Sequence, residues 1–249
     1  MMTERPLYPK VIAGYEDNER GEDARVLAER VVARDGGELK VVNVEKGSPS
    51  DALQALAERG EADLIVLGST HHAAFGSVAP GSVAEHLLHG ARCRLLIAPK
   101  GYAEADHSGD RLRVLAVGYD GMAESQAALD ESAVLAEKFG GSMKVVGVAT
   151  PVPPIGAAAA ARAGPEAGPD FQTRLNDAVA ELPSELRALP VLLKGDPVEQ
   201  LLDVAETGVD LLVLGSRGFG PVMRLLIGSV SSRVIRGAAC PVMVIPRPG

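Results

Sequence analysis

A short apolar stretch that occurs twice decides the fold: residues 210–217 read DLLVLGSR, and residues 63–70 read DLIVLGST. A shift of 147 residues superposes the two, and between 63–100 and 210–247 the residues are identical at 13 of 38 positions without a gap. Self-similarity at a fixed offset indicates a duplicated structural unit. Each stretch is a run of Leu, Ile and Val that ends in glycine, which is typical of a buried strand followed by a loop.

The duplication extends upstream of these stretches. Residues 46–49 (KGSP) match 194–197 (KGDP), and residues 11–16 (VIAGYE) resemble 115–120 (LAVGYD). We therefore predict an N-terminal copy at residues 1–104, a small polar linker at 105–109 and a C-terminal copy at 110–249. The N-terminal copy is shorter by about 45 residues upstream of its KGSP motif, which is enough for one helix and one strand.

The C-terminal copy alternates apolar runs with amphipathic segments. Strands are expected at 113–118, 144–149, 191–194, 210–214 and 242–245. Helices are expected at 125–139, 196–206 and 229–236, and 170–189 is expected to be mostly helical with an interruption at Pro183. Asp196 suits the N-cap of the third helix, and Pro197 suits its first position. This alternation predicts an α/β protein of two tandem, doubly wound, parallel-sheet domains, the first lacking one helix and one strand. Ligands of such folds bind at the carboxyl ends of the strands.

The composition of the 249 residues excludes several classes of protein. Apolar residues make up 46% and aromatic residues 3%, so we expect a globular protein with an aliphatic core. The net charge of −8 disfavours nucleic acid or an anionic membrane as a partner. The two cysteines, Cys93 and Cys240, occupy the same position of the two copies and suit small buried residues. With no signal peptide or membrane span evident, we expect a cytoplasmic location.

The strongest chemical signal is the stretch 215–229, which reads Gly-x2-Gly-x9-Gly-Ser and joins a predicted strand to a predicted helix. Its glycines allow a ligand to approach the backbone, and a helix N-terminus favours an anion. Arg217 and Arg224 add positive charge, and the Ser229 and Ser231 hydroxyls add donors. Phosphate binding and an ordinary loop with turn glycines remain equal alternatives on spacing alone. The chain has no GK[ST] motif, so this is not a Walker P-loop.

A second signal is Asp120, which directly follows the predicted strand 113–118. Its carboxylate is expected to face the same crevice as the glycine loop, where it could accept hydrogen bonds from a ribose or an adenine. The alternative is an aspartate that caps the next helix. A carboxylate and a phosphate loop at one edge of a sheet together suggest a nucleotide.

The order of the motifs VGYDG, GDP, DLLVLGSRG, G-x2-G-x9-GS and AACPVMVIP resembles the universal stress protein family over essentially the whole chain. The resemblance implies a tandem member with the adenine-nucleotide α-hydrolase-like fold, and ATP, with or without Mg²⁺, in the C-terminal copy. The residues that it implicates are Asp120, Val148, Gly215, Arg217, Gly218, Gly228, Ser229 and Val230. It also implies that the last strands, 95–98 and 242–245, pair in an intramolecular pseudo-dimer, with a homodimer as the alternative.

The N-terminal copy departs from the family pattern at its site. His71 stands where the second glycine of the loop would be, and Glu16 replaces the strand-end aspartate. The missing helix and strand remove one edge of the sheet and one wall of the adenine pocket. We therefore expect this copy to bind ATP poorly or not at all, and to serve as a folded partner.

Three functions are consistent with these signals. An ATP-binding regulatory stress protein is the first, a slow ATP hydrolase or nucleotidyl-type enzyme the second, and a scaffold that binds no nucleotide the third. The sequence shows no evident general base or P-loop lysine, so we predict no catalytic residues. We also predict no metal site, because His86 and His89 lack companion ligands at suitable spacing. The Pro- and Ala-rich segment 151–169 is expected to be a loop, either a lid or a disordered insertion.

Overall fold

The computed structural model describes residues 5–43, 48–90, 92–105, 112–150, 170–216 and 228–246. The N-terminal copy contains β1 (Lys10–Tyr15), α1 (Glu19–Asp35), β2 (Glu38–Asn43), α2 (Pro49–Glu58), β3 (Leu64–Gly68), α3 (Ser82–Leu88) and β4 (Arg94–Ala98). The C-terminal copy contains β5 (Val114–Gly118), α4 (Ala123–Phe139), β6 (Ser142–Ala149), α6 (Phe171–Ala180), the 3-10 helix η2 (Ser184–Leu186), β7 (Leu189–Lys194), α7 (Pro197–Glu206), β8 (Leu211–Gly215), α8 (Ser229–Ile235) and β9 (Val242–Ile245). Within these ranges no helix is long and apolar enough to cross a bilayer.

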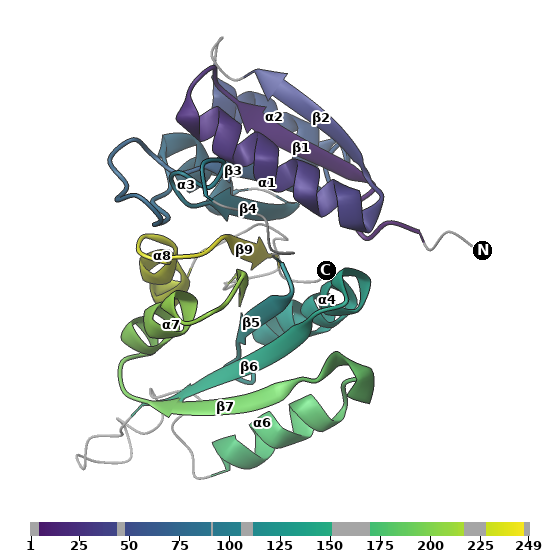
Figure 1. Cartoon of the computed structure of the whole chain (residues 1–249), viewed down its shortest axis with the longest axis vertical. Helices are drawn as coiled ribbons and strands as arrows, with labels where there is room; N and C mark the ends of the chain where they lie inside the picture. The colour runs from purple at the N-terminus through teal and green to yellow at the C-terminus, as the bar shows by residue number, and fades with distance from the viewer. Residues whose placement is uncertain are drawn as a thin grey trace.

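The nine strands of the described residues form one sheet, in the order β2-β1-β3-β4-β9-β8-β5-β6-β7 (Figure 1). The strands are parallel within each copy. The predicted α/β fold is confirmed, and so is the shortening of the N-terminal copy. Residues 44–48 join β2 to α2, whereas 150–196 join β6 to α7 and contain α6 and β7.

The two copies meet where β4 and β9 pair antiparallel, as the sequence predicts for 95–98 and 242–245. Leu96 lies opposite Met243, which is its own counterpart under the shift of 147 residues. The pairing therefore has an approximate two-fold axis that passes perpendicular to the sheet between these residues. We call this junction the seam.

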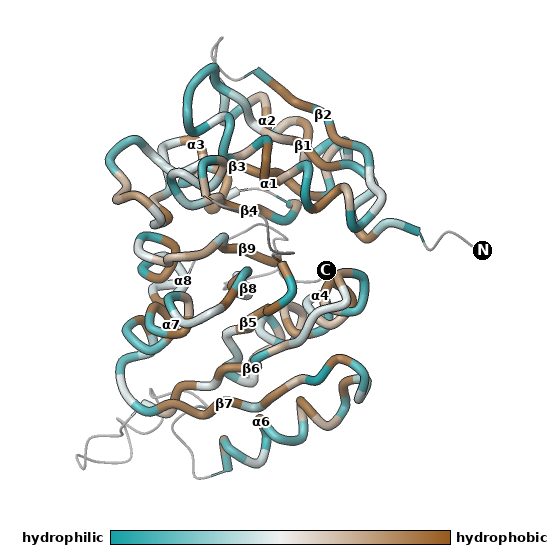
Figure 2. Tube along the Cα trace, viewed as in Figure 1, coloured by the Kyte–Doolittle hydropathy of each residue, from teal (hydrophilic) through white to brown (hydrophobic). Residues whose placement is uncertain are grey.

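Two apolar layers cover the faces of the sheet. Successive side chains of a strand point to opposite faces, so Ile65 lies in one layer while its neighbours Leu64 and Val66 lie in the other. Helices α2, α3, α7 and α8 contribute to the first layer, and α1, α4 and α6 to the second. Figure 2 shows the central strands as mostly hydrophobic segments. Both layers continue across the seam, so each apolar layer is built from residues of both copies.

The two cysteines lie at the same place in the two copies, each just before the last strand. Cys93 and Cys240 are buried in the first apolar layer. Burial raises the pKa of each thiol to about 12, so both stay protonated near neutral pH. The prediction that they are small buried residues is confirmed.

One predicted helix is too long. The helix expected over 170–189 ends at Ala180, and the last residue of the expected range, Leu189, begins β7 instead. Pro183 follows soon after the helix end and cannot donate a backbone hydrogen bond. Beyond the short 3-10 turn, Leu189 pairs with Lys144 of β6, so pairing with the sheet overrides the helical pattern.

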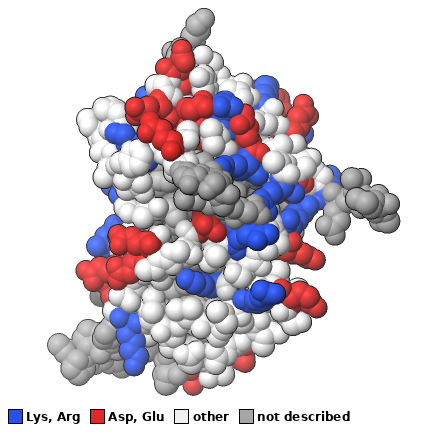
Figure 3. Space-filling view, in the orientation of Figure 1, with Lys and Arg blue, Asp and Glu red and all other residues white. Residues whose placement is uncertain are grey.

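Charged side chains bridge α1 and α4 on the second face. The Lys138 ammonium lies 3.3 Å from the buried Asp35 carboxylate, and the Arg34 guanidinium donates to the Phe139 carbonyl at 2.9 Å. Figure 3 shows Lys and Arg side chains gathered across the middle of this face, where the two halves meet. The seam is therefore supported by polar contacts as well as by the core.

A buried carboxylate of α1 holds the segment that follows β4. Asp23 accepts hydrogen bonds from the Gly101 N–H at 2.9 Å and the Ala103 N–H at 2.8 Å. Burial raises the pKa of this carboxyl, although the two backbone donors oppose the shift.

The raised pKa of Asp23 predicts a pH-dependent difference in stability. A carboxyl whose pKa is higher in the folded state binds more protons there, so its contribution falls as pH rises through the folded pKa. We expect the unfolding free energy of the wild type, relative to Asp23→Asn, to increase as the pH falls from 7 towards 4. Urea denaturation at several pH values measures this difference, with the exposed Asp51→Asn as the control for losing one charge. A difference that does not vary with pH contradicts the prediction.

Candidate functional site

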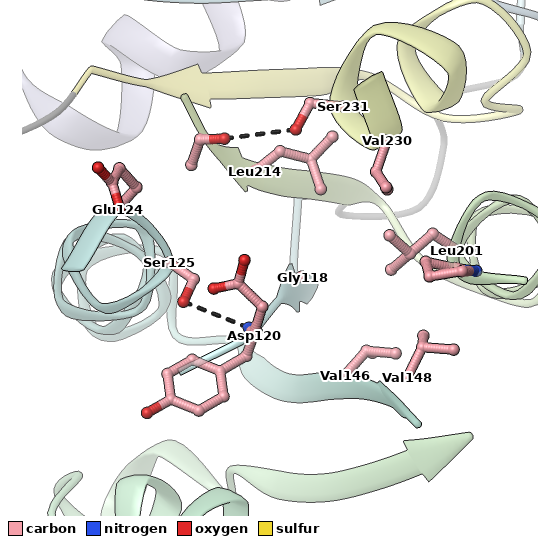
Figure 4. A pocket seen from close by; sticks show the side chains of 13 residues that line it. Gly118, Asp120, Glu124, Ser125, Val146, Val148, Leu201, Leu214, Val230 and Ser231 are labelled. Atoms are coloured by element: carbon pink, nitrogen blue, oxygen red, sulfur yellow. Dashed lines mark hydrogen bonds between the residues drawn. The ribbon is translucent and has the colours of Figure 1, made fainter. Parts of the chain in front are cut away.

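A pocket opens at the carboxyl ends of β5, β6 and β8 (Figure 4). We call it the C-terminal pocket, and it encloses about 640 Å³, including the solvent at its mouth. Its lining residues are Gly118, Tyr119, Asp120, Glu124, Ser125, Val146, Val148, Pro197, Leu201, Leu214, Gly215, Val230 and Ser231. This is the edge of the sheet where the sequence predicts a ligand.

Two strand-end glycines form part of the lining and bring the backbone close to the cavity. A Cβ atom on Gly215 would lie 2.4 Å from the Glu124 carbonyl oxygen, so β8 and the first turn of α4 are in direct backbone contact. A Cβ atom on Gly118 would lie 2.9 Å from Cδ2 of Leu214. Only glycine fits at position 215, because backbone atoms of α4 occupy the space of a side chain, whereas at position 118 the obstacle is the end of the Leu214 side chain.

One end of the pocket is polar and acidic. The Asp120 carboxylate accepts the Met122 N–H at 3.0 Å, and the Ser125 hydroxyl accepts the Asp120 N–H at 3.3 Å. These contacts fix the turn before α4, whose N-cap is Met122. Asp120 is therefore not the helix cap. Figure 4 shows its carboxylate directed towards the space between β5 and β8, with Glu124 on the neighbouring helix.

Tyr119 adds a phenol to the same end of the pocket. Burial raises its pKa, and the adjacent Asp120 carboxylate adds to the shift. The hydroxyl donates to Oε1 of Gln126 at 3.3 Å. The phenol is thus protonated at neutral pH and adds no negative charge to the pocket.

The opposite end of the pocket is apolar. Val146 and Val148 point into it from β6, and Leu201 faces them from α7. The start of α7 is fixed by Asp196, whose carboxylate accepts the Val198 N–H at 2.9 Å and the Glu199 N–H at 3.2 Å. The predicted cap is confirmed, and it places Pro197 and Leu201 against the cavity.

The structure brings only part of the predicted site together. Asp120, Val148, Gly215 and Val230 all line the C-terminal pocket. The remaining predicted residues differ in position: Gly228 is the buried N-cap of α8, Ser229 begins that helix with an exposed side chain, and Arg217 and Gly218 lie outside the described residues.

The site prediction missed most of the other lining residues, among them Val146, Leu201 and Glu124. Val146 could have been found, because it lies two residues before Val148 in one strand and shares its face. Leu201 lies one helical turn after Pro197, so it too follows from the periodicity. Glu124 carries no such signal.

The N-terminal copy has a smaller cleft at the equivalent place. This N-terminal cleft encloses about 500 Å³ and is lined by Gly14, Glu16, Arg20, Gly21, Leu67, Gly68, Thr70, Gly81, Ser82, Val83 and Ala84. The Arg20 guanidinium, whose counterpart is Glu124, forms an ion pair with the Glu16 carboxylate within the cleft. None of the lining residues described comes from β2 or α2, so this cleft lacks the apolar end.

His71 does not line the N-terminal cleft. Its side chain is exposed, and its ring lies next to that of His72 with 3.8 Å between the centroids. The backbone carbonyl of His71 accepts a hydrogen bond from the Lys100 ammonium at 3.0 Å. Among the residues that the structure describes, no three His, Cys, Asp or Glu side chains gather as metal ligands would.

These features define a class of protein: two doubly wound α/β units share one sheet, with a polar–apolar pocket at the strand ends of the second unit. The universal stress protein family model matches residues 3–99 and 112–246. The chain belongs to the universal stress protein family.

Relatives with both copies are found among mycobacteria. A universal stress protein of Mycobacterium tuberculosis is 31% identical over 238 residues, which cover 88% of this chain and 77% of the relative. A universal stress protein of Mycolicibacterium smegmatis is 30% identical over 245 residues, covering 96% and 81%. These likenesses extend across the seam rather than being confined to one copy.

Solved structures share the fold. A universal stress protein from Archaeoglobus fulgidus superposes with a TM-score of 0.58 at 23% identity, covering 90% of this chain and 77% of that one. A functionally unknown protein from Pseudomonas aeruginosa gives a TM-score of 0.66 at 12% identity, covering 96% and 92%. At such identities the likeness concerns the fold alone.

Proposed function

We propose that the chain is an ATP-binding regulatory stress protein, with the nucleotide in the C-terminal pocket. The single observation that supports this most is the polarity of the pocket, which has carboxylates at one end and three aliphatic side chains at the other. A nucleoside has the same division, because its base is flat and largely apolar while its ribose presents hydroxyl donors. In this proposal residues 1–104 and 110–249 are the two domains.

Each part of the pocket has a role in the proposal. The adenine ring lies among Val146, Val148 and Leu201, where apolar contact stabilises it. The Asp120 carboxylate accepts a hydrogen bond from the ribose. The phosphates extend towards the stretch 215–229, and Mg²⁺ enters with them as their counter-ion.

The N-terminal copy serves as a pseudo-dimer partner in this proposal. Its cleft lacks the apolar end, and the Arg20–Glu16 ion pair occupies the place where the C-terminal pocket has two carboxylates. A nucleotide would find no adenine wall there, and the Glu16 carboxylate is already paired with Arg20. One nucleotide per chain is therefore expected.

Mass spectrometry of the purified protein tests this function. The protein is denatured, the supernatant is analysed, and the emptied chain is titrated with ATP by calorimetry. Intact ATP at one equivalent per chain supports the proposal. ADP or AMP formed from added ATP would favour the hydrolase alternative. Absence of nucleotide together with no calorimetric binding would reject the proposal in favour of the scaffold.

A matched pair of variants tests which copy binds. Gly218→Asp is expected to lose ATP while remaining folded, because the new carboxylate repels the phosphates. His71→Asp places the same residue at the equivalent position of the N-terminal copy, and its ATP content is expected to stay unchanged. Nucleotide content per chain is measured for both. Normal ATP in the Gly218→Asp variant contradicts the site assignment.

A further inference from the structure

Three side chains form a polar cluster at the seam, two of them buried and the third, Arg94, 35% exposed. Tyr8 is fully buried, and its hydroxyl donates to Oε1 of Glu131 at 2.6 Å. The Arg94 guanidinium donates to both oxygens of the same carboxylate, at distances between 2.7 and 3.0 Å. Tyr8 and Arg94 belong to the N-terminal copy and Glu131 to α4 of the C-terminal copy. We call these residues the seam cluster.

The seam cluster has no equivalent on the other side of the two-fold axis. The offset of 104 residues that superposes α1 on α4 makes Leu112 the counterpart of Tyr8 and Leu27 the counterpart of Glu131. The counterpart of Arg94 is Pro241. The two leucines are buried in the same apolar layer as Tyr8. One side of the axis is thus polar and fully paired, while the other side is apolar.

This asymmetry distinguishes the three ways in which two copies could pair through their last strands. If two C-terminal copies paired through β9, each Glu131 would face Leu112 and Pro241, which offer no side-chain donor. If two N-terminal copies paired through β4, Tyr8 and Arg94 would face Leu27. Only the mixed pairing satisfies the carboxylate, and a buried charge without a partner is strongly unfavourable.

We propose that the seam cluster selects the N-terminal copy as the partner of the C-terminal copy and excludes symmetric pairing of C-terminal copies from different chains. The β4–β9 register alone cannot make this choice, because Leu96 and Met243 are both uncharged and occupy equivalent positions, although the Met243 sulfur lies 3.4 Å from the Tyr8 hydroxyl. The selection does not depend on whether a nucleotide is bound.

Cross-linking at the seam tests the proposal in the full chain. Met243→Cys is introduced with Cys93→Ala and Cys240→Ala, so that position 243 carries the only thiol. In the mixed pairing this thiol faces Leu96, whereas in symmetric pairing of C-terminal copies it faces its own equivalent. The chain is refolded over a range of concentrations and oxidised, and disulfide-linked dimers are measured on non-reducing gels.

Glu131→Leu gives the C-terminal copy the residue that the N-terminal copy has at this position. It is expected to increase the fraction of cross-linked dimer by about tenfold or more, because self-pairing no longer buries a charge and the mixed pairing leaves Arg94 without its partner. Glu137→Leu is the control, since it makes the same substitution at an exposed position of the same helix. The chain that carries Met243→Cys with an intact seam cluster is expected to give little dimer at any concentration.

A second variant keeps the test decisive if Glu131→Leu does not fold. Tyr8→Leu, Arg94→Leu and Glu131→Leu together make all three pairings apolar, and we expect this variant to fold and to cross-link. The proposal is overturned if the folded variants give no more dimer than Glu137→Leu. It is also overturned if the Met243→Cys chain with an intact seam cluster gives as much dimer as these variants. Failure of both variants to fold would assign the cluster to stability alone and would also overturn it.

Discussion

Replacing Gly215 by alanine is expected to destabilise the chain by about 2–3 kcal/mol and to abolish nucleotide binding. The new Cβ atom would lie 2.4 Å from the Glu124 carbonyl oxygen and 3.0 Å from the Ser125 amide nitrogen. Because both are backbone atoms, the start of α4 must move, and Asp120 and Ser125 move with it. Urea denaturation gives the change in stability, and calorimetric titration with ATP gives the change in binding.

Gly90→Ala is the control for this substitution. Its Cβ atom would approach only the side chain of Gln54, at 3.4 Å or more, and that side chain can turn away. We expect stability and ATP binding close to those of the wild type. If Gly215→Ala and Gly90→Ala had the same stability and the same ATP affinity, the close contact of β8 with the start of α4 would not be needed for the pocket.

Glu131→Ala is expected to lower the free energy of unfolding by about 3 kcal/mol. The substitution removes the carboxylate that pairs with Arg94 and accepts from Tyr8, while the tyrosine stays buried. Burial holds the pKa of Tyr8 well above its ordinary value, and the Glu131 carboxylate contributes to the shift, so the phenol remains a donor that needs an acceptor. Chemical denaturation monitored by circular dichroism measures the loss.

Two further variants show whether the charge or the position matters. Glu131→Gln keeps an acceptor for Tyr8 but loses the ion pair, so an intermediate loss of stability is expected. Glu137→Ala, on the exposed side of α4, is expected to change the free energy of unfolding by less than about 0.5 kcal/mol. A loss that is the same at positions 131 and 137 would contradict the importance of the seam cluster.

The sequence predicts the architecture well because local signals and the duplication agree. The strand at 242–245 is found with those bounds, and Asp196 caps α7. The pairing of the last strands also follows from the sequence, since it extends a property of the resembled family to a duplicated chain. The prediction is wrong beyond Ala180, where the helix was expected to continue to Leu189, because Leu189 pairs with Lys144 of β6 instead.

The parts that sequence reasoning misses depend on contacts between distant residues. Glu131 shares the helix face of Ala128 and Leu135, yet the sequence does not show that Tyr8 and Arg94 of the other copy lie opposite it. The sequence carries no signal either for the ion pair that Arg20 forms with Glu16 inside the N-terminal cleft. Neither pairing is visible without the fold, because helical periodicity gives the face of a residue and not what lies opposite it.

The antiparallel seam has a consequence for how other molecules reach this chain. Each site lies at the carboxyl ends of the strands of its own copy. Because β4 and β9 run in opposite directions, the C-terminal pocket and the N-terminal cleft open on opposite sides of the molecule, at opposite ends of the strands. A molecule bound at one opening therefore leaves the other uncovered. In the proposed function, a bound nucleotide changes the surface at the C-terminal pocket. The N-terminal cleft keeps its Arg20–Glu16 ion pair, and its surface stays the same.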